Sequence, residues 1–360
     1  MAIESNRYDK IGAINLRFNE IIGNDDKKEY LNNIIKNQKI SNSYIFTGNS
    51  GIGKMLFARE FARKILCLEN GDDNCICKSC VSISNGNPDL IILDKQEDEE
   101  LDARKEESIK EYEKLNGIKS KRSSRSKKED SETEKKKKKL ITVDDVRNLI
   151  SKLAQKPICS QRKVCIINDA DTMNKNAQNC LLKTLEEPPG FLTIILVVSD
   201  TNKLLSTIKS RCNIIKYGPI ADDVLEKYAI KYLGYDEISK NMIRAFDGSI
   251  GRAKELKGNI DQYSQIENFI SNVDKDNLID FIKNSKVIYD KENITDILDY
   301  IVVCLYSKTN DKYSKYIECI KYVNECNKRL MSNTNFNMCL DDMVLKIWEE
   351  INENRYRGEV

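Results

Sequence analysis

Residues 43–55 have the sequence SYIFTGNSGIGKM, and this stretch decides the fold. The apolar run 43–47 favours a β-strand, the loop after it has the spacing G-x-x-x-x-G-K, and MLFAREFARKIL has the pattern of a helix. Backbone N–H groups of such a loop close on phosphate oxygens at a helix N-terminus, and the lysine adds positive charge. The stretch therefore predicts a P-loop that binds ATP through Gly48, Gly51, Gly53 and Lys54.

The rest of the expected ATPase site departs from a hydrolysing one. Met55 stands where Ser or Thr would bind Mg²⁺, and a thioether is a poor ligand for a hard cation. After the apolar run 163–167, Asn168 replaces the metal-binding acid and Asp169 the water-activating glutamate; a frame shifted by one would leave Ala170 as the base. These residues predict nucleotide binding, retained or weakened, with little hydrolysis. The alternative is that the loop only stabilises the fold.

Four of the twelve cysteines lie within CLENGDDNCICKSC, at Cys67, Cys75, Cys77 and Cys80. Four thiolates can hold a structural Zn²⁺ ion, and a redox-active pair is the alternative. The other eight cysteines stand singly in mostly apolar surroundings, so we expect them to pack in the core. The chain contains no histidine, which excludes histidine as a general acid, general base or metal ligand.

The order of patterns along the chain predicts three domains. Five apolar runs alternate with helical segments, which predicts a doubly wound α/β domain over residues 1–220. Only helical patterns follow, in a small all-α domain at 221–258 and a helical domain at 259–360.

Segment 94–139 is almost wholly charged or small and polar, so we expect it to be disordered. Its five consecutive lysines at 135–139 suit nonspecific contact with nucleic acid or simply a solvated loop. The net charge of the whole chain is only +2. No stretch of 18 apolar residues or secretory signal is present, so we expect a cytoplasmic protein.

Several motifs together carry a family resemblance. NPDLIIL (87–93), LLKTLEEPP (181–189) and SRC (210–212), in this order after the P-loop, resemble the AAA+ clamp-loader subunits of bacterial DNA polymerase III. The similarity covers residues 17–257 apart from the charged loop, and it is strongest to the delta-prime family of these subunits.

This resemblance implies an AAA+ P-loop domain, a small all-α lid domain and an all-α C-terminal collar domain that joins a ring. It implies a zinc module at 67–80, although the spacing between Cys75 and Cys77 is tighter than the family pattern. It also implies that Arg211 is an arginine finger that acts in trans on a neighbouring ATPase subunit. From the residues alone, a surface ion pair is the alternative role for Arg211.

The resemblance further implies a nucleotide-sensing arginine in the second domain. That place falls on Gly251, with Arg252 one residue later. Together with Met55, Asn168 and Asp169, this favours a non-hydrolysing delta-prime subunit. The chain length of 360 residues, without the extra domains of a tau subunit, favours the same expectation. The implied partners are gamma/tau-like and delta-like subunits, the sliding clamp and primer-template DNA.

Two other functions remain open. One is an active gamma/tau-like ATPase motor, with Asp169 as an adequate base. The other is a zinc-stabilised DNA-binding scaffold outside the loader that uses the lysine-rich loop.

Overall fold

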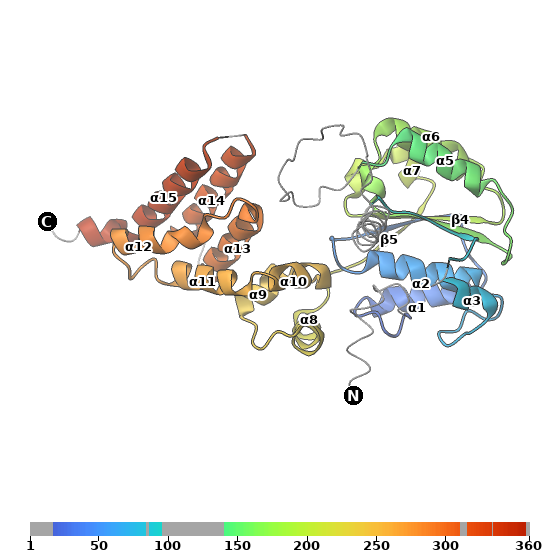
Figure 1. The fold of residues 1–360 in the computed structure, drawn as a ribbon, viewed down its shortest axis with the longest axis horizontal. Coiled ribbons are helices and arrows are strands. Elements are labelled where there is room, and N and C mark those ends of the chain that lie inside the picture. The colour runs from blue at the N-terminus through green and yellow to red at the C-terminus, as the bar shows by residue number, and fades with distance from the viewer. Residues whose placement is uncertain (1–16, 84–85, 96–139, 310–314, 333, 358–360) are drawn as a thin grey trace, which may run out of the picture. The chain divides into compact units, whose positions relative to one another are not determined.

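The computed structural model describes residues 17–83, 86–95, 140–309, 315–332 and 334–357, the last five of these as backbone only. The expected disorder of the charged insertion therefore concerns residues that lie, apart from Asp94 and Lys95, outside the described ones. The chain divides into two compact units, residues 1–224 and 225–360 (Figure 1). Among the helices described, none has the length and apolar character that a membrane span needs.

A five-stranded sheet with the order β2-β3-β4-β1-β5 forms the centre of the first unit, and every pairing in it is parallel. The strands are β1 (Ser43–Thr47), β2 (Leu90–Leu93), β3 (Lys163–Ile167), β4 (Leu192–Val198) and β5 (Asn213–Lys216). Each one lies where an apolar run predicted it, which confirms the predicted α/β fold. β2 differs from the expected fully buried strand, because it is an edge strand of the sheet and only half-buried.

Helices cover both faces of this sheet (Figure 1). The larger ones are α1 (Asp25–Lys36), α2 (Lys54–Leu66), α5 (Val143–Leu153) and α6 (Lys175–Glu186). One core cluster joins Leu31 of α1 and Phe61 of α2 to Phe46 of β1. A second cluster joins Leu149 of α5 and Leu181 of α6 to the opposite side of the strands. The remaining short elements are α3 (Lys78–Ser82), η3 (Ala170–Thr172), η4 (Thr201–Lys203) and α7 (Ser206–Lys209).

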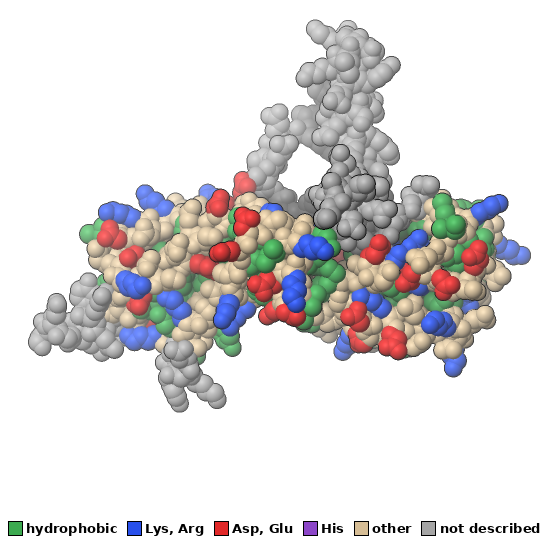
Figure 2. Space-filling model, turned by 90° about the horizontal axis from the view of Figure 1, so that it is seen from below, with side chains coloured by type: hydrophobic (Ala, Val, Ile, Leu, Met, Phe, Trp, Pro, Cys, Tyr) green, Lys and Arg blue, Asp and Glu red, His purple; other side chains and the backbone are tan. Residues whose placement is uncertain are grey.

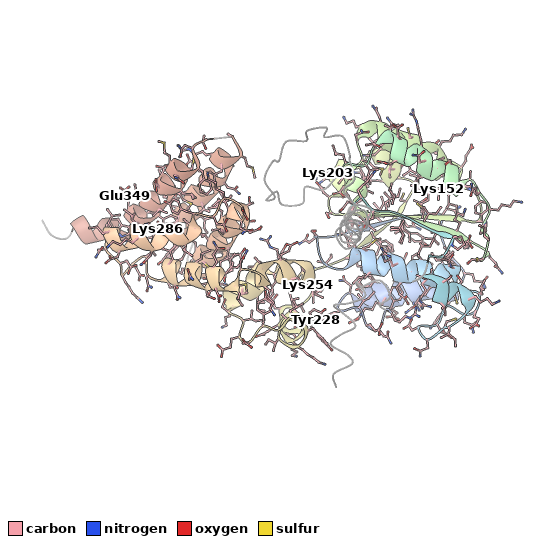
Figure 3. The ribbon with its side chains drawn as sticks, in the orientation of Figure 1. Lys152, Lys203, Tyr228, Lys254, Lys286 and Glu349 are labelled. Carbon is pink, nitrogen blue, oxygen red and sulfur yellow. The ribbon has the colours of Figure 1, made fainter. Side chains whose placement is uncertain are left out.

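Local signals in the sequence set the helix ends of this unit. The Thr142 side chain accepts from the backbone N–H of Asp145, whose carboxylate accepts from Thr142 N–H, so a capping box begins α5. Lys152, labelled in Figure 3, lies near the other end of α5, and its carbonyl oxygen accepts a hydrogen bond from Lys163 Nζ at 3.1 Å. α6 ends at Glu186, two residues before Pro188, which cannot continue a helix.

From residue 222 to the end, the described chain is helical. The elements are α8 (Asp222–Tyr228), the π-helical η5 (Ala229–Leu233), α9 (Lys240–Ala245), α10 (Ile250–Lys257), α11 (Ile260–Ser271), α12 (Leu278–Asn284), η6 (Ser285–Ile288), α13 (Ile294–Ser307), α14 (Lys315–Met331) and α15 (Phe336–Arg357). Tyr228, labelled in Figure 3, ends α8 and packs its ring on that of Tyr232. α12 begins with a cap, because the Asn277 side chain accepts a hydrogen bond from the backbone N–H of Asp280.

The single cysteines mostly occupy the apolar positions expected for them. Five are buried and two are intermediate, but Cys159 is exposed, so the prediction of core packing was wrong for that residue. It lies in the loop before β3, where the backbone and not the side chain faces inward. Charged side chains of both signs are interspersed on the visible face of each unit (Figure 2), consistent with the small net charge.

The fully buried carboxylate of Asp89 holds that loop. Its two oxygens accept the backbone N–H groups of Ile158, Cys159 and Ser160 at 2.6 to 2.7 Å. A buried carboxylate is tolerated only where it is paired or hydrogen-bonded, and here three backbone N–H groups donate to it. Asp89 thus joins the start of β2 to the loop that leads into β3.

Asp89→Ala should lower the free energy of unfolding by about 3 kcal/mol, because a buried donor left without an acceptor costs roughly 1–3 kcal/mol. Urea unfolding of the full chain measures the change. Arg147→Ala is the matched control, since that side chain is 68% exposed, and it should shift stability by about 0.5 kcal/mol or less. A loss for Asp89→Ala no larger than the control's would contradict the assignment.

Candidate functional site

The loop between β1 and α2 has the geometry of a phosphate-binding loop. Gly48 has φ 155°, and a Cβ atom placed on it would lie 2.6 Å from both the Tyr217 carbonyl oxygen and Ile52 Cδ1. Gly53 has φ 92° and forms the N-cap of α2. A side chain at Gly48 would therefore collide with its surroundings, and one at Gly53 would strain the backbone.

Lys54 lies across this loop. Its Nζ donates to the carbonyl oxygens of Gly48 at 2.7 Å and Asn49 at 2.6 Å, and the residue is buried. The amine and the N-terminus of α2 thus bring positive charge to the same loop, which favours an anion there.

Met55 packs against the hydrophobic core. Its half-buried side chain packs against the core cluster that contains Phe57 and Phe61. The position where a P-loop ATPase presents a hydroxyl to Mg²⁺ therefore carries an apolar group that contributes to packing.

Asn168 and Asp94 meet at the carboxyl edge of the sheet. Each is the first residue after one of the neighbouring strands β3 and β2. Asn168 Nδ2 donates to Asp94 Oδ2 at 2.9 Å, and Asp94 is only 7% exposed. Sequence reasoning missed Asp94, although an acid directly after the run DLIIL was a usable signal. The amide that replaces the expected metal-binding acid is thus engaged by a carboxylate from the next strand.

Asp169 has a left-handed backbone, with φ 46° and ψ 43°. Its carbonyl oxygen accepts from the N–H and the hydroxyl of Thr172, both at 2.8 Å, which tightens the turn after β3. Non-glycine residues in this region are uncommon, and Asp is among those enriched there. The sheet order also places Ser199, the first residue after β4, between the P-loop and Asn168. That residue was missed because only the strand order reveals its place.

Arg211 lies beside the end of α6. Its guanidinium pairs with Glu186 at 2.8 Å and donates to the Thr207 carbonyl at 2.8 Å and the Ser210 hydroxyl at 3.4 Å. The Arg211 side chain is 35% exposed and that of Glu186 46%. The structure thus brings the SRC and LLKTLEEPP motifs together, and the ion pair that the residues alone suggested is present within the chain.

Arg252 is engaged inside the second unit. It pairs with Asp296 of α13 at 2.8 Å and lies 3.9 Å from Asp299. Burial would lower the pKa of Arg252, but Asp296 and Asp299 raise it above its ordinary value. The arginine next to the expected sensing position is therefore held by two carboxylates of its own unit.

The four clustered cysteines converge on one point. All four sulfurs lie within 4.8 Å of one another, with Cys67 Sγ 3.5 Å from Cys75 Sγ and 3.9 Å from Cys77 Sγ. A tetrahedral zinc ion with Zn–S bonds of about 2.3 Å requires sulfurs about 3.8 Å apart. The tight spacing of Cys75 and Cys77 does not prevent convergence, and these four residues can hold one metal ion.

Backbone N–H groups point at sulfurs of this cluster, whereas burial raises the pKa of the Cys80 thiol to about 11. Burial opposes ionisation of Cys77, but the backbone N–H groups of Leu68 and Cys80 lower the pKa of its thiol to about 6. Cys67 Sγ accepts from the N–H groups of Glu69 and Gly71 at 3.4 and 3.3 Å. Thiolate is the form that binds metal, so these donors suit a metal centre.

Comparison with known proteins shows the family to which the chain belongs. A family model described as "DNA polymerase III, delta subunit" matches residues 23–221, more than half of the chain. The chain belongs to this family. The match to the DNA polymerase III family contains the P-loop, Asn168, Asp169, the four cysteines and Arg211, whereas Gly251 and Arg252 lie outside it.

Individual relatives include both kinds of clamp-loader AAA+ subunit that the sequence resembles. A gamma/tau subunit of DNA polymerase III from Mycoplasma genitalium is 29% identical over 220 residues, which cover 61% of this chain and 30% of that protein. The delta' subunit from Bacillus subtilis is 27% identical over 240 residues, 65% of this chain and 59% of the relative. The chain thus spans less than two thirds of the length of each. A gamma subunit-related protein from Thermotoga maritima aligns in structure with 15% identity and a TM-score of 0.44, over 90% of this chain and 99% of that one.

If the cysteine cluster holds zinc, the purified chain should contain about one zinc per molecule, since four thiolates form one closed site. Cys77→Ser should remove most of that zinc, and chelation of the wild-type chain should lower its melting temperature by about 5 °C or more. Metal analysis and thermal unfolding measure these quantities. Cys159→Ser is the matched control, an exposed cysteine outside the cluster. Zinc content unaffected by Cys77→Ser would exclude this site.

Proposed function

We propose that this chain is a clamp-loader subunit of bacterial DNA polymerase III, of the delta-prime type. It assembles with gamma/tau-like ATPase and delta-like subunits and helps load the sliding clamp onto primed DNA. Family membership and similarity to subunits named delta' and gamma/tau support this proposal.

The observation that carries the non-hydrolysing assignment is the apolar Met55 side chain, which packs against the hydrophobic core. A hydroxyl at this position supplies a Mg²⁺ ligand in P-loop NTPases, and Mg²⁺ neutralises the charge that develops during phosphoryl transfer. Asn168 supplies an amide in place of the second metal ligand, and that amide is bonded to Asp94. The glycines and Lys54 still form a cradle for phosphate, so we infer that nucleotide binding is separable from hydrolysis in this chain.

Arg211 is the residue that we propose acts on a neighbour's ATP. It is partly exposed, and Glu186 and the Thr207 carbonyl hold its guanidinium in one orientation. An ordered guanidinium loses less conformational entropy when it meets a phosphate than a freely rotating one does. In this proposal the γ-phosphate of a partner subunit takes the place of the Glu186 carboxylate.

The remaining assignments complete the proposal. The segment 221–258 serves as a lid domain and 259–360 as a collar that joins the subunits into a ring. Zinc bound at 67–80 has a structural role. Any ATP and Mg²⁺ bound in this chain's own site undergo little hydrolysis. The protein acts in the cytoplasm as part of the replication machinery.

A gamma/tau-like motor is the second candidate function. Its support is the complete glycine loop, the presence of Lys54 beside it, and similarity to gamma/tau subunits. In that case Asp169 orients the attacking water.

Arg211→Ala in a reconstituted loader should slow hydrolysis at the site that it serves by about 10³-fold, the range known for arginine fingers. DNA-stimulated single-turnover ATP hydrolysis and loading of labelled clamp onto primed DNA measure this effect. Arg147→Ala, another exposed arginine of the same unit, is the matched control. Unchanged hydrolysis and loading by the Arg211 variant would refute the role in trans.

Lys54→Ala should weaken nucleotide binding by the isolated chain about tenfold or more, since a charge-assisted hydrogen bond contributes roughly 1.5–3 kcal/mol. Titration with a fluorescent nucleotide measures this, with Lys283→Ala, an exposed lysine of the second unit, as the control. Steady-state ATP turnover should be equally low in the wild-type chain and both variants. Turnover that depends on Lys54 would favour the motor function instead.

A further inference from the structure

Two consecutive basic residues near the end of α2 are buried. Arg63 is 2% exposed and Lys64 is 5% exposed. Removing a charge from water costs several kcal/mol unless partners offset the loss, so the partners of these side chains indicate their role.

Each nitrogen of the Arg63 guanidinium has a defined acceptor. Nε and Nη2 bond to the two carboxylate oxygens of Glu60 at 2.6 and 2.8 Å, and Nη2 also bonds to the Asp72 carbonyl at 3.1 Å. Nη1 donates to Cys80 Sγ at 3.1 Å. The guanidinium is therefore oriented by a buried carboxylate so that one of its edges faces a sulfur of the cysteine cluster.

The charge of the metal-bound cluster explains why a cation at Cys80 is favourable. Four thiolates around one Zn²⁺ ion leave a net charge of −2 in a largely buried place. Glu60 lies 3.7 Å from Arg17 as well as bonding to Arg63, so these three side chains together carry a net charge of +1. Arg63 faces Cys80 Sγ directly, whereas the Glu69 carboxylate lies 3.3 Å from Cys75 Sγ and adds negative charge there.

Lys64 holds a second part of the same module. Its Nζ donates to the Gly71 carbonyl at 2.9 Å and pairs with the Asp73 carboxylate. Both acceptors lie in the loop between Cys67 and Cys75. The last turns of α2 thus hold the metal-binding loop through Lys64 and the sulfur of Cys80 through Arg63.

We propose that Arg63 is an outer-shell positioning residue of the zinc centre, which donates to the metal-bound thiolate of Cys80 and ties that centre to the P-loop helix. This inference rests on the zinc assignment made above. Because α2 begins at Lys54 and ends at Leu66, its length of about 20 Å joins the zinc module to the phosphate-binding loop through one rigid element.

The test compares Arg63→Gln and Arg63→Lys with the wild-type full chain. Competition with a chromophoric chelator measures zinc affinity, and Co²⁺ substitution reports the ligands by absorption. We expect Arg63→Gln to bind zinc 10- to 100-fold more weakly, as outer-shell changes do. We also expect its sulfur-to-cobalt charge-transfer band to shift, because one thiolate loses a hydrogen bond. Arg63→Lys should bind zinc with intermediate affinity, since lysine keeps the positive charge but lacks the planar guanidinium that bonds to two partners at once.

Matched variants separate the possible outcomes. Arg147→Gln should leave both the affinity and the spectrum unchanged. If Arg63→Gln does not fold because Glu60 loses its two-bond partner and keeps only Arg17, Glu60→Gln combined with Arg63→Gln removes both charges and gives the same test. If a folded variant binds zinc with wild-type affinity and its cobalt charge-transfer band does not shift, the role of Arg63 is overturned but the zinc assignment is not. A wild-type chain without a tetrathiolate cobalt spectrum overturns the zinc assignment itself.

Discussion

Every strand pairing in the sheet is parallel, and this constraint places the candidate nucleotide site. The carboxyl ends of all strands meet at one edge, so the residues that follow them become neighbours even when the sequence separates them widely. Because β4 lies between β1 and β3, the P-loop and Asn168 lie on either side of Ser199. Asp94 follows the next strand outward and bonds to Asn168. The chain then leaves the P-loop through α2, which runs back across the sheet.

The amino edge of the sheet carries the second centre, and a buried polar network organises it. Asp89 fixes the loop before β3, and the Ser160 hydroxyl of that loop bonds to the Leu66 carbonyl and lies 3.1 Å from Ser79 Oγ. Asn87 in turn donates to Ser79. Because such satisfied networks rigidify the elements that they join, the cysteine cluster is built on the same contacts that order the beginnings of β2 and β3.

Local signals made the strands, the P-loop and the Thr142 cap predictable, because hydrophobic period and capping chemistry depend on residues a few positions apart. The partners of the site residues depend on how distant elements come together. Asp94 lies 74 residues from Asn168 and Asp296 lies 44 from Arg252, so no local pattern reports either contact. The exposure of Cys159 was unpredictable for a similar reason, because Asp89, 70 residues away, draws its backbone inward.

Two residues of the P-loop motif also stabilise the folded loop itself. Gly48 is required by the Tyr217 carbonyl, which leaves no space for a Cβ atom. Lys54 satisfies two carbonyl oxygens of the loop. Both residues therefore stabilise the folded loop in addition to any contact with phosphate. The Met55 side chain makes a different contribution, because it packs against the core cluster. If the chain does not hydrolyse ATP, as we propose, these structural roles explain why the glycines and the lysine are present without the hydroxyl.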